Sequence, residues 1–437
     1  MNDSLMGNPG VSVLDRLTNP AHPVPPRALI VNANGEPLWD SGDTTLPLAL
    51  TGITKLFTLA MVLREIDRGA LSLDTTLGEV LPADTVRGLC VVGTDDHSFS
   101  ITIENLLRHQ SGIVDYMRPG RHSQRSLEQQ FLEHDRAWTL DQALEIVRHY
   151  PGIHVPGQSS RAHLSSTNHL LLGAVLQETT GMNFEQLIQL RVVGSLGLSN
   201  TYVFSSEHFD KYFTLSPIHS GSRVIRIPQA LASSCADGAI ISTPQDTLTF
   251  SRAFWNGEIF RDSWLPQLGL GHAKCEKSLR MGLGMMVAPA RRGKPPIVGY
   301  SGIAGCAVGV DVDKGHHAFL TTFQWSSPTS SFVAVASLLQ AHVPKFRALN
   351  RRGRSSAQDP GNRLGAVLTG ESFAVKKVAQ ATRSSTRING PHFAKTLARE
   401  LFSQLRLVWA LTTRQSLIND IWGELTCTQF LLHRPTG

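Results

Sequence analysis

The chain is poor in cysteine, and its cysteines follow no pattern. The 437 residues contain five, at positions 90, 235, 275, 306 and 427. Their number is odd and no two are spaced as CxxC, so the sequence predicts neither a disulfide framework nor a zinc site. No P-loop or dinucleotide-binding glycine pattern occurs either. We therefore expect incidental thiols, and neither a metal nor a cofactor.

Long apolar runs are also missing. No run reaches the length of about 18 residues that predicts a membrane-spanning helix. The first residues, MNDSLMGNPGVSVLD, lack the basic and apolar regions of a secretory signal. The sequence thus predicts a cytoplasmic protein without a membrane span.

The basic excess is confined to one end of the chain. The formal net charge is +6. Residues 345–437 contain 15 Lys and Arg against 5 Asp and Glu, a net +10, so residues 1–344 carry −4. The high isoelectric point belongs to this tail, and we expect no nucleic-acid partner. The composition, 41% hydrophobic and 17% charged, is typical of a globular protein.

A long apolar stretch at 49–73, ALTGITKLFTLAMVLREIDRGALSL, predicts a buried helix. Thr51 is the expected N-cap, and Gly69 is the expected stop after the last turn. Lys55 lies inside this apolar run. A buried lysine is costly unless it has a partner or a function, so Lys55 is a candidate functional residue.

The order of the other segments predicts three regions. Residues 1–26 are expected to be an irregular lead-in, followed by a folded domain over 27–344. The domain should begin with a hairpin around Asn34-Gly35. The segments MGLGMMV, PIVGYSGIAGCAVGVDVD and HHAFLTTFQW, between 281 and 325, should be consecutive strands of one antiparallel sheet, closed by a helix.

The basic extension, 345–437, is predicted to be partly flexible, with a helix at 392–412. We expect a loosely docked extension. A weaker alternative is a basic amphipathic helix that associates with a partner or a membrane surface.

The folded domain resembles a known family. Its helix at 49–73 is similar to the Ser-x-x-Lys helix of the serine β-lactamase and penicillin-binding-protein superfamily. The segments 100–116, 156–204 and 235–257 resemble, in the same order, segments of the class C β-lactamase branch. This resemblance implies an α/β (α+β) fold of the β-lactamase type. An antiparallel sheet flanked by helices would pack against a mostly helical subdomain.

The first family motif aligns on Gly52-Ile53-Thr54-Lys55. In the family, the serine at the first position attacks a carbonyl and is activated by the lysine one helical turn away. Here Lys55 is the one retained side chain of the motif. Gly52 has no side chain and cannot form an acyl-enzyme.

The other two motifs are also altered. The Tyr-x-Asn motif aligns with Leu164 and Ser166, neither of which can replace a phenol or an amide well. The Lys/His-x-Gly motif aligns with Tyr300 and Gly302, so its cation is missing. These positions, with Gly52, are expected to line the ancestral cleft.

The sequence leaves three functions open. The favoured hypothesis is a pseudoenzyme that binds an acyl or peptide-like small molecule. The second is an active esterase, D-aminopeptidase or transacylase using altered residues, and the third is a decayed gene product without a role. If the cleft is preserved, changing Gly52→Ser, Leu164→Tyr and Ser166→Asn together is expected to give weak esterase activity.

Overall fold

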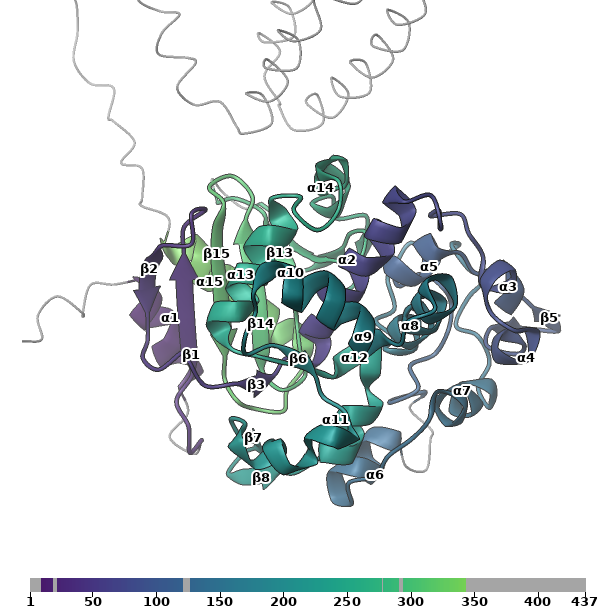
Figure 1. The fold of residues 1–437 in the computed structure, drawn as a ribbon, viewed down its shortest axis with the longest axis horizontal. Coiled ribbons are helices and arrows are strands. Elements are labelled where there is room, and N and C mark those ends of the chain that lie inside the picture. The colour runs from purple at the N-terminus through teal and green to yellow at the C-terminus, as the bar shows by residue number, and fades with distance from the viewer. Residues whose placement is uncertain (1–8, 19–21, 121–125, 277, 291–293, 343–437) are drawn as a thin grey trace, which may run out of the picture. The chain divides into compact units, whose positions relative to one another are not determined.

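The computed structural model describes residues 9–18, 22–120, 126–276, 278–290 and 294–342 (Figure 1). Within them, one antiparallel sheet has eight strands in the order β10-β11-β12-β13-β14-β15-β1-β2. In chain order they are β1 (Arg27–Val31), β2 (Pro37–Asp40), β10 (Ala273–Lys274), β11 (Arg280–Met281), β12 (Met286–Ala288), β13 (Ile297–Ser301), β14 (Cys306–Asp311) and β15 (His316–Thr321). The sheet predicted between 281 and 325 is thereby confirmed.

Short strands form smaller sheets beside it. These are β3 (Leu48–Ala49), β6 (Tyr202–Val203) and β9 (Ile240–Ser242) in one sheet, β4 (Val91–Val92) with β5 (Asp95–Asp96), and β7 (Ile218–Ser220) with β8 (Arg223–Ile225).

Helices make up most of the remaining described structure. The α-helices are α1 (Pro9–Leu17), α2 (Thr54–Asp67), α3 (Leu77–Val80), α4 (Ala83–Val86), α5 (Ile103–Leu107), α6 (Leu127–Glu133), α7 (Leu140–Arg148), α8 (Thr167–Thr180), α9 (Phe184–Ile188), α10 (Gly194–Leu196), α11 (Pro228–Ser233), α12 (Cys235–Gly238), α13 (Pro244–Trp255), α14 (Leu265–Leu268) and α15 (Pro328–His342). A short 3₁₀ turn, η1 (Thr51–Ile53), precedes α2.

Helices cover both faces of the large sheet. Gly309 of β14 faces α15, because a Cβ at Gly309 would meet Val335 at 3.3 Å. The next residue of β14 pairs with His317, whose Nδ1 lies 2.9 Å from Ser251 Oγ of α13. Since successive strand residues point to opposite faces, α13 and α15 lie on opposite sides of the sheet.

Local sequence signals account for several element ends. Gly35, at φ +89°, forms the turn between β1 and β2, as predicted. Thr102 caps α5 by accepting a hydrogen bond from the Asn105 backbone N–H. Gly181 ends α8 in the left-handed conformation that glycine adopts without strain. Gly69, at φ +76°, lies just beyond α2, where the predicted stop was placed.

The N-terminal lead-in differs from the prediction of an irregular segment. It contains α1, whose Val13 and Leu14 are buried in the hydrophobic core. Helix α1 packs against α15. A tertiary contact of this kind stabilises a short helix that the turn-rich local composition does not indicate.

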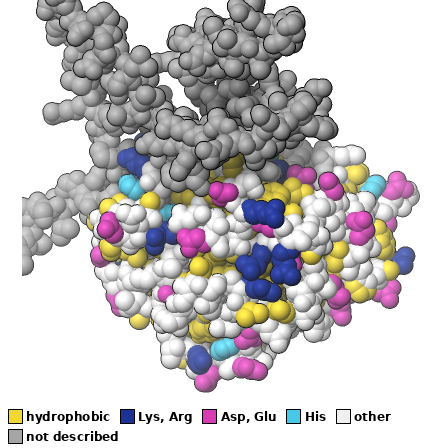
Figure 2. Space-filling model, turned by 45° about the horizontal axis from the view of Figure 1, so that its top comes forward, with side chains coloured by type: hydrophobic (Ala, Val, Ile, Leu, Met, Phe, Trp, Pro, Cys, Tyr) yellow, Lys and Arg dark blue, Asp and Glu magenta, His cyan; other side chains and the backbone are white. Residues whose placement is uncertain are grey.

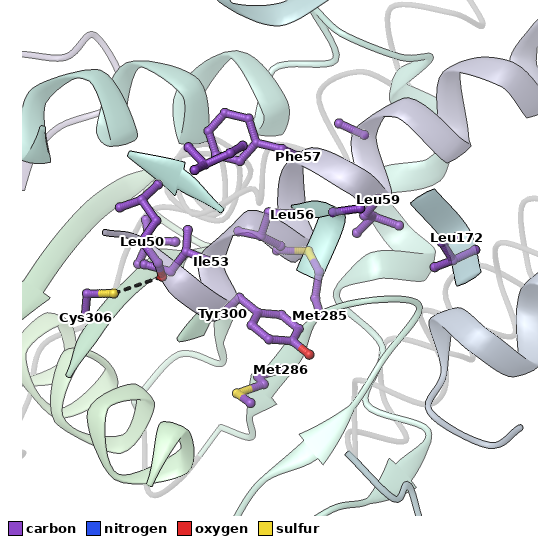
Figure 3. Close-up of a cluster of buried hydrophobic side chains, with 14 of the residues drawn as sticks. Leu50, Ile53, Leu56, Phe57, Leu59, Leu172, Met285, Met286, Tyr300 and Cys306 are labelled. Carbon is purple, nitrogen blue, oxygen red and sulfur yellow. Dashed lines mark hydrogen bonds between the residues drawn. The ribbon is translucent and has the colours of Figure 1, made fainter. Parts of the chain in front are cut away.

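Helix α2 occupies the interior, as predicted, but it is shorter than the predicted 49–73, because β3 and η1 take up the first residues. It packs against α8 and α12. The η1 turn that leads into it meets the large sheet at β13 and β14. Figure 3 shows this junction, where the Cys306 thiol of β14 donates to the Leu50 carbonyl at 3.1 Å. The start of α2 thus lies between the sheet and the helical part of the fold.

The described surface carries charges of both signs. On the face in Figure 2, one small group of Lys and Arg side chains is surrounded by scattered acidic side chains. None of the described helices combines the length and apolarity needed to cross a membrane. The predicted extension at 345–437, with its helix at 392–412, lies outside the described residues.

We predict that a chain ending at residue 344 unfolds cooperatively in urea. Helix α15 buries Phe332, Val335, Leu338 and Leu339. Each such side chain contributes roughly 2 kcal/mol, so a control chain ending at 326 should not fold. Absence of a cooperative transition in the 1–344 chain would contradict the predicted domain boundary.

Candidate functional site

The turn that leads into α2 has an unusual backbone. Thr51 has φ +43°, a left-handed conformation that is strained for a β-branched residue. Its hydroxyl accepts a hydrogen bond from the Ala304 N–H at 3.3 Å. The helix itself begins at Thr54, without a side-chain cap. The predicted capping role of Thr51 is therefore wrong, because its hydroxyl is directed to the turn after β13.

Gly52 lies directly against the end of β13. A Cβ added to Gly52 would overlap the carbonyl oxygen of Ser301 and approach Gly302 Cα at 3.2 Å. In the reverse direction, a Cβ added to Gly302 would overlap the Thr51 hydroxyl and the Leu50 carbonyl. Glycine is thus required on both sides of this contact, and the backbone of β13 fills the space that a side chain at position 52 would need.

Lys55 is buried and paired. It is 7% exposed, and its ammonium forms an ion pair with the carboxylate of Asp237, which is 2% exposed. The ammonium also donates to the Asp237 carbonyl at 3.0 Å. Tyr116 donates to the other carboxylate oxygen at 3.2 Å. Burial and the neighbouring Asp237 carboxylate raise the pKa of Tyr116 well above its usual value, so its hydroxyl stays protonated.

A second network centres on His109. Its Nδ1 accepts from the Ser165 backbone N–H at 3.2 Å and from Asn168 Nδ2 at 3.0 Å. Since a backbone N–H is always a donor, Nδ1 is the unprotonated nitrogen, and Nε2 donates to the Tyr300 hydroxyl at 3.0 Å. Asn168 is held in turn by Ser111. Burial, and then Lys55, lower the pKa of His109 to about 3, so the ring is neutral.

Both networks border one pocket of about 250 Å³. Five predicted positions, Gly52, Lys55, Leu164, Ser166 and Tyr300, line it. Gly302 is not among the lining residues, because it lies under Thr51 in the closed junction. The structure therefore brings the ancestral-site positions together, but around a pocket whose reactive position is filled by backbone.

Sequence reasoning missed the groups that hold this site together, chiefly Asp237, His109 and Tyr116. Asp237 is the carboxylate of an otherwise small and apolar run, CADGAII. A buried carboxylate that accompanies a buried lysine is the signal that could have identified the pair.

The described His, Asp and Glu side chains of the site do not form a metal-binding group. Among the described residues, no three His, Cys, Asp or Glu side chains are grouped closely enough to hold an ion. Its chemistry therefore has to be argued from the hydroxyls, the neutral imidazole and the ion pair that line the pocket.

Comparison with known proteins places the chain in a family context. The Beta-lactamase family model matches residues 28–354. A D-stereospecific amidohydrolase from Streptomyces sp. has a similar structure, with 23% identity, a TM-score of 0.61, and coverage of 77% of this chain and 98% of that chain. EstCE1, a hydrolase with promiscuous acyltransferase activity, is 16% identical with a TM-score of 0.61, and the match covers 76% of this chain and 97% of that chain. A penicillin-binding protein from Bacillus halodurans is 18% identical with a TM-score of 0.57, and the match covers 75% of this chain and 98% of that chain. These likenesses show the β-lactamase-like fold.

We predict that Asp237→Leu lowers the free energy of unfolding by about 3–5 kcal/mol, because it leaves the Lys55 charge buried without a partner. The double variant Lys55→Met with Asp237→Leu should recover most of this loss. Urea denaturation of the four proteins of the cycle measures both effects.

The exposed pair of Arg148 and Glu145, 3.4 Å apart, provides a matched control. Glu145→Ala should cost under about 1 kcal/mol. If Asp237→Leu lowered the free energy of unfolding by as little as Glu145→Ala, Lys55 would not be a buried charge that depends on Asp237.

Proposed function

The chain belongs to the beta-lactamase family, and from that premise we propose that it is a member that does not form an acyl-enzyme and that binds a small ligand in the inherited cleft. Family chemistry needs a hydroxyl at the first position of the Ser-x-x-Lys motif. That position is Gly52, and the Ser301 carbonyl lies where a side chain would project. This contact is the observation that carries the proposal.

The state of Lys55 supports the same proposal. A lysine that activates a serine must exchange a proton with it, so its amine has to face the nucleophile. Here the amine is directed to Asp237, through both the carboxylate and the carbonyl. An amine held by this carboxylate and carbonyl is not directed at position 52, where the family's chemistry needs it.

Ligand binding remains compatible with the pocket. Small-molecule sites combine apolar walls with a few placed polar groups. The walls here include Phe131, Leu164 and Trp325. Because His109 Nε2 donates to the Tyr300 hydroxyl, that hydroxyl keeps its own proton for a ligand acceptor. The described residues supply it with no other hydrogen-bond partner.

An active hydrolase with a relocated nucleophile is the second candidate, and the presence of Ser166 in the pocket is the observation that favours it. The amidohydrolase and EstCE1, whose folds are similar, are hydrolases, and this similarity supports esterase, D-aminopeptidase or transacylase activity as the alternative. However, no hydrogen bond among the described residues joins the Ser166 hydroxyl to His109 or Lys55. A serine without a base is a weak nucleophile.

We predict that neither a fluorescent β-lactam nor an activated ester leaves a covalent adduct on the purified protein. Intact mass spectrometry and product fluorescence are the measurements. Lys55→Met is the matched comparison, since it removes the one retained motif side chain. An adduct, or turnover that Lys55→Met abolishes, would contradict the proposal.

We predict that Gly52→Ser destabilises the protein by roughly 1–3 kcal/mol, because the new side chain meets a backbone carbonyl that cannot rotate away. For the same reason, the triple change with Leu164→Tyr and Ser166→Asn should not give the weak esterase activity expected from sequence. Urea denaturation and ester hydrolysis test both statements.

Gly269→Ser is the control substitution. The nearest atoms to a Cβ at Gly269 lie 3.9 Å away, and its φ is −74°. This variant should change the free energy of unfolding by less than about 0.5 kcal/mol. Ester hydrolysis by a stable Gly52→Ser variant would show that the position is open.

A further inference from the structure

Most charges around the pocket are neutralised within the protein. Lys55 is paired with Asp237. Arg118 donates to Glu128 through two of its nitrogens, and Glu128 also accepts from the Trp325 indole at 2.8 Å. The two cations that line the pocket therefore have their own carboxylates. Neither is free to act as the counter-ion of an anionic ligand.

Two carboxylates that line the pocket form no ion pair with any described residue, although the charges of Lys55 and Arg118 act on Asp115 from a distance. Asp115 lines the pocket, is half-buried, and accepts a hydrogen bond from the Met117 backbone N–H at 3.0 Å. Glu276 lines it as well and is exposed. No ion pair to either carboxylate occurs among the described residues. After the internal pairs are set aside, the described lining carries two negative charges.

The neutral part of the lining, like its two carboxylates, favours a positively charged ligand. Tyr300 stands where the family has a cationic side chain, and it is neutral because burial raises its pKa well above the usual value. The aromatic rings of Phe131 and Trp325 also line the pocket, with centroids 5.9 Å apart. Aromatic faces attract cations, and a desolvated carboxylate gains most from a cation placed beside it.

We infer that the pocket binds a ligand that carries a positively charged amine, with the Asp115 carboxylate as its counter-ion and the aromatic walls around its apolar part. The inference rests on the proposed ligand-binding function and names the ligand class. It reverses the charge preference that a cation at position 300 would give.

The ionisation of Asp115 supplies a pH signature. Burial, with the nearby Asp237 carboxylate, raises the pKa of Asp115 to about 6, while the Met117 N–H, Lys55 and Arg118 oppose the shift. The carboxylate is charged above this pKa and neutral below it. Amine binding should therefore be strong at pH 7.5 and weaken by about tenfold toward pH 5. His109 does not titrate in this window, because its pKa is about 3.

Three probes of similar size test the ligand class on the full-length protein by titration calorimetry. They are 2-phenylethylamine, 2-phenylethanol and 3-phenylpropanoate, which are a cation, a neutral molecule and an anion at pH 7.5. We expect the amine to bind at least about tenfold more tightly than either of the others. Equal or tighter binding of the alcohol or the anion, or no binding of the amine at millimolar concentration, would overturn the inference.

The variant Asp115→Asn should weaken amine binding about tenfold and remove its dependence on pH between 5 and 7.5. Asp210→Asn removes a charge of the same sign from an exposed residue outside the pocket lining. This control should change neither the affinity for the amine nor its dependence on pH. If Asp115→Asn does not fold, the pH profile of the unmodified protein decides alone, and a flat profile overturns the inference. Loss of amine selectivity without covalent adducts would leave the proposed non-acylating function standing, whereas an adduct would refute that function separately.

Discussion

The contact between the end of β13 and the turn before α2 determines what this site can do. Gly52 and Gly302 let two backbones approach so closely that neither position accepts a side chain. Thr51 has a strained backbone at this contact, and strain of this kind persists only where the surroundings impose it. The contact joins the sheet to α2 at the point where a family enzyme needs an accessible hydroxyl.

The ion pair of Lys55 and Asp237 follows from the same arrangement. In the non-acylating protein that we propose, the ammonium has no reaction partner in the pocket, and a buried unpaired charge would be costly. Asp237 on α12 meets this requirement and ties α12 to α2. In our account Lys55 is thereby a structural residue. The polar groups of the pocket that remain for a ligand are those of Asp115, Tyr300 and Glu276.

Local patterns predicted the elements well, and they predicted the site in part. The hairpin at Asn34-Gly35, the strands after residue 281 and the end of α8 at Gly181 depend on residues close together in sequence. The partner of Lys55 lies 182 residues away, and no periodicity reports such a pair. The closed junction at Gly52 is likewise a tertiary feature, so the sequence indicated that the serine was lost but not that its space was filled.

The central claim is that no hydroxyl of the pocket is positioned to become acylated. A crystal structure of the protein soaked with an aryl boronic acid tests it directly, since boron forms a tetrahedral adduct with an activated serine or threonine hydroxyl. Our account predicts no covalent density on Thr51, Ser165 or Ser166, and a Ser301 carbonyl still in contact with Gly52. A boronate bonded to any of these hydroxyls, or a junction opened at Gly52, would contradict it.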